Sequence, residues 1–484
     1  MNYTEILNTG APAALIPLAV ILLAAFTKKI VPALITGILL GGLLFTRGNI
    51  IETSLYAAHK LSGALKAGDG VYIVFFLYLF GALSDIIKVS GGIKGFTLLA
   101  SRVVKTEKGA LGAVWAMTPF TFIDCCFHGI SAGMVGKSLN DKVNGNKKKL
   151  AFVLNITSCL LIILIPFGTT YVGYIMGVIS SAFTKAGMDM PAYDAYLKSI
   201  PFNFFPIIMV LISVFAVVFN FGFKKDYLPK TAHDDDIFEK EHGHDEAHEK
   251  CTFEENAPPR AANLIIPLSA LIFMTVFFLY YTGRANTGEN GFFTSLISAD
   301  FERAIFASGL VTLVLTSIFY LFQKIPLREI ESHFFSGGNE MLTPIVVLIL
   351  SWGLSGIISD LGFEKFVSSV VASKLPAFLI PVTIYLIGSA TSYFIGTAWG
   401  TWALLMPLAI PLAAEAGISV PLVIGAVLSG GALGDHASPL GETGILSASI
   451  AGVPLYSHIR SQLPYSLLGL GVSAVLFVVF PLFL

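Results

Sequence analysis

Long apolar runs alternate with short polar connectors along most of the chain. The runs are clearest at residues 11–26, 30–45, 71–87, 264–281 and 463–484. As helices, segments of this length span the roughly 30 Å hydrocarbon core of a bilayer. Of the 484 residues, 55% are hydrophobic and only 13% are charged, whereas soluble domains carry about 25% charged residues. The pattern predicts an all-α polytopic protein surrounded by membrane lipid, and nothing in it indicates a nucleic-acid partner.

The chain also repeats itself. Four short motifs of the first half recur in the same order in the second half. After the first pair, the two members of each pair lie about 270 residues apart. The pairs are LIPLA (15–19) with IIPLS (265–269), GALSDII (81–87) with WGLSGII (352–358), TFID (121–124) with YFIG (393–396), and IPFGTT (165–170) with SPLGET (438–443). We therefore expect two structural repeats, residues 1–223 and 261–484, joined by a linker at 224–260.

Each repeat contains the same predicted series of elements. Two plain spans, a polar connector and a third span come first, and an interrupted hairpin, a broken span and a final span follow. The interrupted and broken segments are predicted at 110–136 with its interruption at Thr118-Pro119, at 377–413 with its interruption around Gly396, Gly400 and Pro407, at 150–183 and at 421–451. The final spans are predicted at 202–221 and 463–484.

Basic residues decide whether the interrupted segment at 110–136 crosses the membrane. Its two flanks are both basic, through Lys88, Lys94, Arg102, Lys105 and Lys108 before it and Lys137, Lys142, Lys147, Lys148 and Lys149 after it. Cytoplasmic loops carry an excess of Lys and Arg, so both flanks are assigned to the cytoplasm. The segment is then a re-entrant hairpin, and each half has an odd number of crossings. We expect two inverted repeats in the cell (inner) membrane, with about ten transmembrane spans, two re-entrant hairpins and two broken helices.

The linker at 224–260 is acidic and rich in histidine. The composition is typical of a flexible cytoplasmic linker. A second interpretation is a metal-binding segment, because His242, His244 and His248 offer imidazole ligands. Both interpretations stay open.

Ionisable residues gather in the broken span of the second half, at residues 434–443 (GDHASPLGET). An ionisable group at bilayer depth costs several kcal/mol unless it faces a cavity, an ion or a partner. Broken backbone is tolerated at that depth only where protein or a water-filled cavity surrounds it. We therefore predict an ion or substrate site that includes Asp435, His436, Ser438, Glu442 and Thr443. A carboxylate there can hold Na+ or a proton. His436 either changes the proton affinity of that carboxylate, shuttles the proton, or makes a purely structural hydrogen bond.

The other three interruptions offer further candidates. Half-helix ends near the midplane carry partial charges that suit ions and substrates. The candidates are Asp124 in the first hairpin, with His128 one helical turn on as its expected partner; Thr397, Trp399, Gly400 and Thr401 in the second hairpin; and Asn155, Ser158, Thr169 and Thr170 in the first broken span. Helix capping and close packing of small residues are the alternative interpretations. The three cysteines in apolar segments (Cys125, Cys126 and Cys159) are interpreted as small apolar fillers.

Several of these segments resemble the NhaC-type Na+/H+ antiporter family. GDHASPLGETGILSAS (434–449) with HIRSQLPYSLL (458–468) resembles that family's GDHxSPxSDTTxxSS and HVxTQLPYA motifs, and GTAWGTWALLMPLAIPLA (396–413) resembles GTSWGTFxxMMPIxIPL. FID (122–124) and KKLAFVLNITS (148–158) resemble FIDD and REKLAYIxDST. The chain departs from the family's pattern at three acidic positions, where it carries Glu442 for aspartate, Asn155 for aspartate and Cys125 for a second acid.

The resemblance implies a secondary antiporter that moves Na+ against H+ by alternating access, with no cofactor. Asp435, Glu442 and Thr397 are then the expected Na+ ligands. The family also includes exchangers of organic acids, so a small organic anion or an amino acid stays open as a transported species, as does a homodimeric assembly. An ion channel is disfavoured because inverted broken repeats are typical of alternating access. Ser438 and His436 complete no catalytic triad, so a transporter rather than an enzyme is expected.

Overall fold

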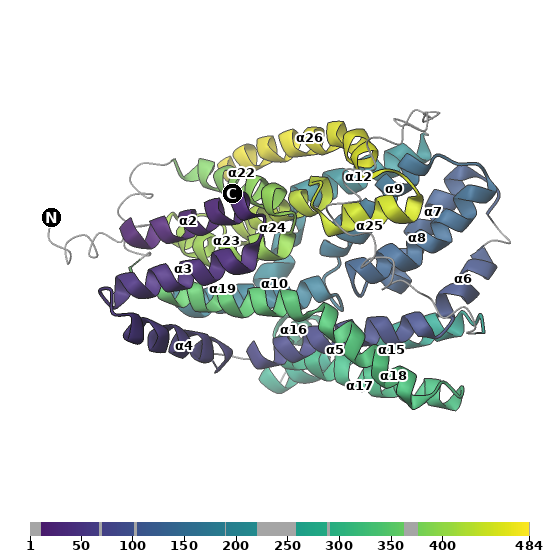
Figure 1. Cartoon of the computed structure of the whole chain (residues 1–484), viewed down its shortest axis with the longest axis horizontal. Coiled ribbons are helices and arrows are strands. Elements are labelled where there is room, and N and C mark those ends of the chain that lie inside the picture. Colours follow the sequence, from purple (N-terminus) through teal and green to yellow (C-terminus); the bar gives the residue numbers. More distant parts are fainter. Residues whose placement is uncertain are drawn as a thin grey trace.

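The computed structural model describes residues 11–66, 70–100, 104–188, 190–219, 258–287, 291–362 and 376–483. These residues form helices and the turns between them, and no strand occurs among them. Figure 1 shows that most helices run along the long axis of the molecule. The predicted all-α class is therefore confirmed, whereas most of the histidine-rich linker lies outside the described residues.

The two halves contain similar elements in the same order. The first half consists of α2 (Ala11–Thr27), α3 (Ile30–Phe45), α4 (Ile50–Lys66), α5 (Gly70–Val89), α6 (Gly92–Ala100), α7 (Glu107–Thr121), α8 (Cys125–Lys142), α9 (Lys147–Asn155), the π-helix η1 (Ile156–Leu161), α10 (Thr170–Ala186), α11 (Ala192–Ser199), η2 (Ile200–Phe202) and α12 (Phe204–Val218). The second half consists of α15 (Ala262–Thr287), α16 (Phe292–Ile297), α17 (Phe301–Phe322), α18 (Leu327–Glu340), α19 (Leu342–Asp360), η4 (Ala377–Leu379), α22 (Ile380–Ile395), α23 (Ala398–Glu415), α24 (Val420–Ala437), α25 (Glu442–Ala451), α26 (Leu455–Val479) and η5 (Phe480–Leu482).

Helices α5 and α19, which contain the predicted third spans, each pack against the other half of the chain. Helix α5 of the first half packs on α17 and α18 of the second, and α19 of the second half packs on α3 and α4 of the first. The α5–α18 contact is very close, because a Cβ on Gly81 would overlap the carbonyl oxygen of Gly337. Close backbone approach through small residues is typical of helix pairs in membranes. The pairing fits two related repeats, while their inverted orientation and the boundaries 1–223 and 261–484 stay predictions.

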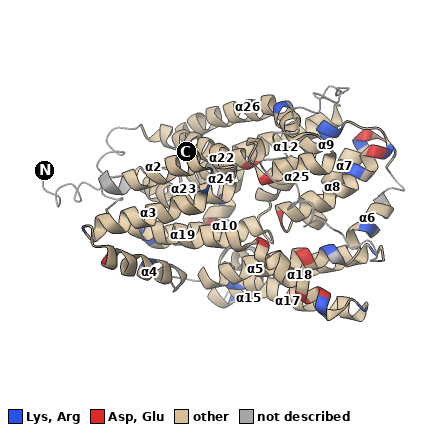
Figure 2. Cartoon of the chain, viewed as in Figure 1, with Lys and Arg blue, Asp and Glu red and all other residues tan. Residues whose placement is uncertain are grey.

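The first hairpin is built from α7 and α8. Its two outer ends lie together, because the backbone N–H of Asn146 donates to Glu107 Oε1 at 3.1 Å. Figure 2 shows charged residues gathered at these outer ends of α7 and α8, while most of the helical surface is uncharged. The helix breaks at 122–124 rather than at Thr118-Pro119, so that detail of the prediction is wrong. Pro119 lies inside α7, and the break follows where Asp124 caps the start of α8.

Both predicted broken spans contain their break. The second-half span runs from Val420 to Ala451 and breaks between Ala437 and Glu442, and 94% of an apolar 18-residue stretch within it is buried. In the first half, helical structure ends shortly after the π-helix η1 and resumes at Thr170. A π-helical turn inside a longer helix often marks a functional site. These two spans place broken backbone inside the protein, where it is tolerated at membrane depth.

Seven helices among the described residues are long and apolar enough to cross a bilayer, and there are eight if the bent pair α11–α12 forms one span. Two further apolar helices, α2 and α3, are shorter. The last span differs from its prediction, because α26 begins at Leu455 rather than at residue 463. The helix extends through its polar start because His458 and Gln462 are buried. The chain is thus a multi-pass membrane protein, and its expected ten crossings stay a prediction.

Candidate functional site

Four breaks in the helical structure are connected to one another. They lie at residues 122–124, 164–169, 396–397 and 438–441. The first two are joined by a hydrogen bond in which Thr170 N donates to Ile123 O at 2.8 Å. The last two are in contact at Gly396, where an added Cβ would lie 2.6 Å from Leu440 Cβ. Gly396 also has a φ of +81°, which glycine adopts without steric cost. The contacts described below connect the first pair to the second.

Asp435 is enclosed by neutral hydrogen-bond donors. Its side chain is 4% exposed. The Cys159 thiol and the Tyr171 hydroxyl each donate to Asp435 Oδ2 at 3.1 Å, and both come from the first half. Thr443, across the break, donates to the Asp435 backbone carbonyl at 3.0 Å and lies 3.3 Å from Oδ1. The predicted pair Asp435 and Thr443 is thus in contact, and no Lys or Arg among the described residues forms a salt bridge with Asp435.

Glu442 has a different environment although it lies only seven positions further on. It is the first residue of α25, where the helix dipole favours a negative charge. Its side chain is exposed, and Cys126 of the first hairpin donates to Glu442 Oε1 at 3.3 Å. The interpretation of the cysteines as apolar fillers is therefore wrong for Cys126 and Cys159, because their thiols contact carboxylates.

Asp124 begins α8 and links two breaks of the first half. Its Oδ1 accepts hydrogen bonds from the backbone N–H groups of Cys126 and Phe127 at 2.9 and 3.1 Å. The other oxygen, Oδ2, accepts from Thr170 Oγ1 at 3.1 Å. The structure supports capping for one oxygen and leaves the second facing the predicted residue Thr170.

His128 does not contact the Asp124 side chain, so the predicted pair is wrong. The His128 ring lies 2.6 Å from Thr121 Oγ1 and 3.0 Å from Thr157 Oγ1. Asp124 is the capping residue outside the helix, and its side chain turns toward the N–H groups of α8. Helical spacing therefore fails to bring the carboxylate onto the face of the imidazole.

His436 points away from the carboxylates into an aromatic environment. Neither ring nitrogen has a hydrogen-bond partner, and the ring lies 6.2 Å from the rings of Phe152 and Phe205. The backbone carbonyl of His436 accepts from Asn155 at 3.0 Å and from Gln462 at 2.7 Å. The predicted residue Asn155 thus stabilises the end of α24, because the last carbonyls of a helix lack partners within it.

The second hairpin contributes aromatic side chains near Asp435. The Trp399 ring lies 4.8 Å from the Tyr171 ring, and Tyr174 donates to the Trp399 carbonyl at 2.8 Å. Thr401 donates to the carbonyl of Thr397 within the hairpin at 3.2 Å. The hairpin therefore supports Tyr171, which in turn contacts Asp435.

Two predicted residues of this hairpin lie against the loop between α2 and α3. A Cβ on Gly400 would lie 2.8 Å from Ile30, so this glycine permits close packing. Thr397 borders an open hollow of about 300 Å³ that Lys28 and Lys29 also line. The predicted role of Thr397 as a Na+ ligand beside Asp435 and Glu442 stays a prediction.

Three predicted hydroxyls have local partners or none. Ser438 Oγ accepts from Leu440 N at 3.1 Å, and Thr169 Oγ1 accepts from Val172 N at 2.9 Å as the cap of α10. Both contacts favour a structural role in turning the chain. Ser158 Oγ is buried without a hydrogen-bond partner, which leaves it available to a ligand.

Sequence reasoning missed three residues that contact the site: Cys159, Tyr171 and Gln462. Tyr171 directly follows the predicted Thr169 and Thr170, and Gln462 lies in the family-like segment 458–468. The sequence positions of Tyr171 and Gln462 could therefore have pointed to the site. The position of Cys159 could not, because a thiol in an apolar segment is usually inert packing.

Comparison with known proteins agrees with this arrangement. The model of the Na+/H+ antiporter family matches residues 161–482, which is more than half of the chain. An uncharacterised protein of Haemophilus influenzae is 26% identical over 461 residues, which cover 93% of this chain and 86% of that one.

Two antiporters match shorter regions. The malate-2H+/Na+-lactate antiporter of Bacillus subtilis is 31% identical over 194 residues, 39% of each chain. The Na+/H+ antiporter NhaC of Alkalihalophilus pseudofirmus is 27% identical over 173 residues, 34% of this chain and 36% of that one. These alignments span less than two-fifths of each antiporter, so their substrates are not transferred with them.

A solved structure shares the fold. The YdaH transporter of Alcanivorax borkumensis superposes with a TM-score of 0.55 over 89% of both chains, at 15% sequence identity. At that identity the likeness concerns the fold alone. The family match, the multi-pass helical fold and the linked helix breaks lead to one conclusion: the chain belongs to the Na+/H+ antiporter family and is a secondary transporter.

Proposed function

We propose that the protein exchanges Na+ for H+ at Asp435, in the cell membrane. One observation carries the proposal: Asp435 is 4% exposed, and no lysine or arginine among the described residues forms a salt bridge with it. An unpaired buried charge costs several kcal/mol. The carboxylate is stable in this environment when it holds a proton or a metal cation, and the two compete for the same oxygens.

The neighbouring groups suit this competition. Tyr171 and Thr443 offer oxygen atoms next to the carboxylate, and hard cations prefer oxygen ligands. The end of α24 supplies further carbonyl oxygens with partial negative charge. We assign Asp124, which accepts from Thr170, and Glu442, at the start of α25, as secondary cation-binding groups beside the same helix breaks.

The test is Na+-driven proton movement in proteoliposomes. An imposed Na+ gradient is expected to change the internal pH in vesicles that contain the wild-type protein. Asp435→Asn is expected to abolish this change. Asp194→Asn is the matched control, because Asp194 pairs, among the described residues, only with Lys198 of the same helix. The Lys198 side chain is 60% exposed. No Na+-driven proton flux in the wild type would refute the proposal.

A second candidate is exchange that includes a small organic anion. The observation in its favour is an open hollow of about 300 Å³ beside Thr397, which Lys28 and Lys29 line. Ligand clefts start at about this volume, and two lysines favour an anionic group. The malate–lactate relative also exchanges organic acids, as its name states.

The same vesicles distinguish the two candidates. The second candidate predicts that malate or lactate inside the vesicles raises the Na+-driven proton flux, and that Lys28→Ala/Lys29→Ala removes the stimulation. Unchanged flux in the presence of either acid, and of amino acids, would leave simple Na+/H+ exchange.

A further inference from the structure

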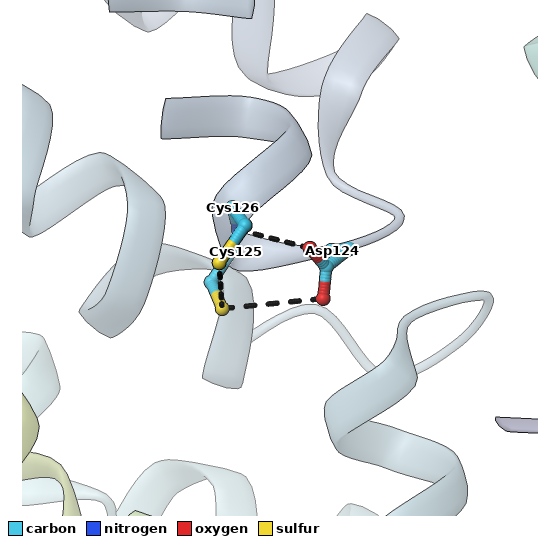
Figure 3. A group of neighbouring side chains, drawn as sticks. All are labelled: Asp124, Cys125 and Cys126. Atoms are coloured by element: carbon cyan, nitrogen blue, oxygen red, sulfur yellow. Dashed lines mark hydrogen bonds between the residues drawn. The ribbon is translucent and has the colours of Figure 1, made fainter. Parts of the chain in front are cut away.

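Two thiols and a carboxylate meet at the start of α8. Asp124, Cys125 and Cys126 are consecutive, and their ligand atoms all lie within 4.8 Å of one another. Cys125 Sγ is 4.0 Å from Asp124 Oδ2 and 4.0 Å from Cys126 Sγ. Figure 3 shows the three side chains directed toward a common space at the first turn of the helix.

A fourth ligand group comes from the other half of the chain. Glu442 Oε1, at the start of α25, lies 3.3 Å from Cys126 Sγ. The close group holds two sulfur ligands and one oxygen ligand, and Glu442, which contacts Cys126 alone among them, would add a second oxygen and link the first hairpin to the second-half broken span.

The spacing fits a tetrahedral metal ion. Zinc binds sulfur at about 2.3 Å and carboxylate oxygen at about 2.0–2.2 Å, so neighbouring ligand atoms of a tetrahedral site lie roughly 3.4–3.8 Å apart. The contacts from Asp124 to Cys125 to Cys126 to Glu442 measure 4.0, 4.0 and 3.3 Å, and the first three ligand atoms all lie within 4.8 Å of one another. Binding of one ion by all four groups requires the Glu442 side chain to turn toward Asp124 and Cys125.

The ligand types exclude Na+ as the preferred occupant. Thiolate ligands select soft or borderline cations, whereas hard cations prefer an all-oxygen shell. The environment of Asp435 differs, because a phenol and a threonine hydroxyl contact that carboxylate along with one thiol. The two groups of ligands therefore differ in the cations they favour.

The group is also reachable and already partly organised. Cys126 is half-buried and Glu442 is exposed, while Asp124 and Cys125 are 3% and 4% exposed. Asp124 Oδ1 remains engaged in capping α8, which fixes the carboxylate and leaves Oδ2 for a metal. The hydrogen bond from Thr170 to Oδ2 would be lost, at a cost of about 1 kcal/mol for a typical hydrogen bond.

We propose that Asp124, Cys125, Cys126 and Glu442 form a site for a thiophilic divalent cation such as Zn²⁺ or Cd²⁺, and that the bound cation arrests transport by tying α8 to α25. The arrest rests on the proposed exchange function, whereas the binding does not. A ligand set from both halves holds them in one arrangement, and alternating access requires them to move relative to each other.

Cd²⁺ titration of the purified protein tests the binding. The readout is the ultraviolet charge-transfer band of a Cd–thiolate bond. The titration uses a background with His242→Ala, His244→Ala and His248→Ala, which removes competing imidazoles of the linker. We expect a saturable band that is lost in Cys125→Ser/Cys126→Ser and kept in Cys251→Ser, the matched control, which replaces the cysteine of the linker at 224–260. A band that survives the double substitution, or that disappears in Cys251→Ser, overturns the site.

A variant that keeps both thiols protects the test against misfolding of the double variant. Glu442→Gln retains the size of the side chain and is expected to weaken Cd²⁺ binding at least about tenfold, which is 1.4 kcal/mol. Unchanged Cd²⁺ affinity in Glu442→Gln would show that Glu442 is not a ligand. The proposed metal link between the two halves would then be wrong.

Proteoliposomes test the arrest. Cd²⁺ is expected to inhibit Na+-driven proton flux, a chelator is expected to restore it, and Cys126→Ser is expected to raise the half-inhibiting concentration at least about tenfold. A Cd–thiolate band without any Na+-driven flux in the wild type would keep the site and refute the exchange function. Flux that Cd²⁺ leaves unchanged despite the band would refute the arrest.

Discussion

The two broken spans have similar positions in the two halves of the chain but differ in charge. The second-half span carries Asp435 and Glu442 at its break, whereas the first-half break, with Thr169 and Thr170, has only neutral side chains. The first-half span instead contains a π-helical turn, and its Cys159 and Tyr171 reach across to Asp435. The second half thus supplies the charge, and the first half supplies two of the donors that surround it.

On the proposed exchange at Asp435, this division separates the charge of the site from the groups that surround it. Two charged copies in contact would place like charges in a low-dielectric interior, where their repulsion is strong. A neutral copy avoids that repulsion and still provides hydrogen bonds, which contribute about 1.5–3 kcal/mol each when the partner is charged. The following substitutions test whether charge and donors are separated in this way.

The largest effect is expected at Asp435. Asp435→Asn removes the charge and keeps the size, so Na+-driven proton flux should fall to the level of empty vesicles. The same substitution at Asp194 should leave the flux near wild type. Retained coupling in Asp435→Asn would exclude this carboxylate as the exchange group.

A smaller loss is expected at Glu442. Glu442→Gln should lower Na+-driven flux about tenfold, equivalent to 1.4 kcal/mol, because this exposed carboxylate assists the exchange without carrying it. Glu442→Asp retains the charge and should keep most of the flux. Equal flux in both variants would mean that the charge at this position has no part in transport.

The neutral span is tested at Tyr171. Tyr171→Phe removes one donor to Asp435 Oδ2, and a hydrogen bond to a charged group contributes about 1.5–3 kcal/mol. The carboxylate then holds a proton more readily, so the Na+ concentration for half-maximal flux should rise about tenfold or more. The measurement is flux against Na+ concentration at fixed pH. An unchanged value would remove Tyr171 from the site.

The smallest effects are expected at two adjacent threonines. Thr170→Val removes the donor to Asp124 Oδ2 and should raise the half-maximal Na+ concentration a few-fold, about 1 kcal/mol for one hydrogen bond. Thr169→Val removes the cap of α10 and should cost about 0.5–2 kcal/mol of stability, seen as a lower Tm. If the two variants exchange phenotypes, the assignment of binding and capping is reversed.

Much of this arrangement is predictable from sequence because membrane burial makes polar residues conspicuous. The breaks at Gly396 and at residues 438–441 follow from glycine, proline and charge in apolar runs, and the structure confirms both. The break expected at Thr118-Pro119 does not occur, because Pro119 lies inside α7. The break lies instead just before α8, which begins after the cap residue Asp124.

Contacts between distant segments could not be predicted from the sequence. The bonds from Cys159 to Asp435 and from Cys126 to Glu442 join residues separated by 276 and 316 positions. Spacing along a helix also predicted a pair of Asp124 and His128 that does not form. Local patterns locate the breaks, but tertiary packing decides which side chains face one another across them.

Na+ binding to the purified protein with simultaneous detection of released protons tests the competition at Asp435 most directly. Na+ added to unbuffered, detergent-solubilised wild-type protein at a pH where the site is protonated should displace protons into solution. Asp435→Asn should release none, and Asp194→Asn should release as many as the wild type. Na+ binding without proton release in the wild type, or equal release in Asp435→Asn, would contradict exchange at this carboxylate.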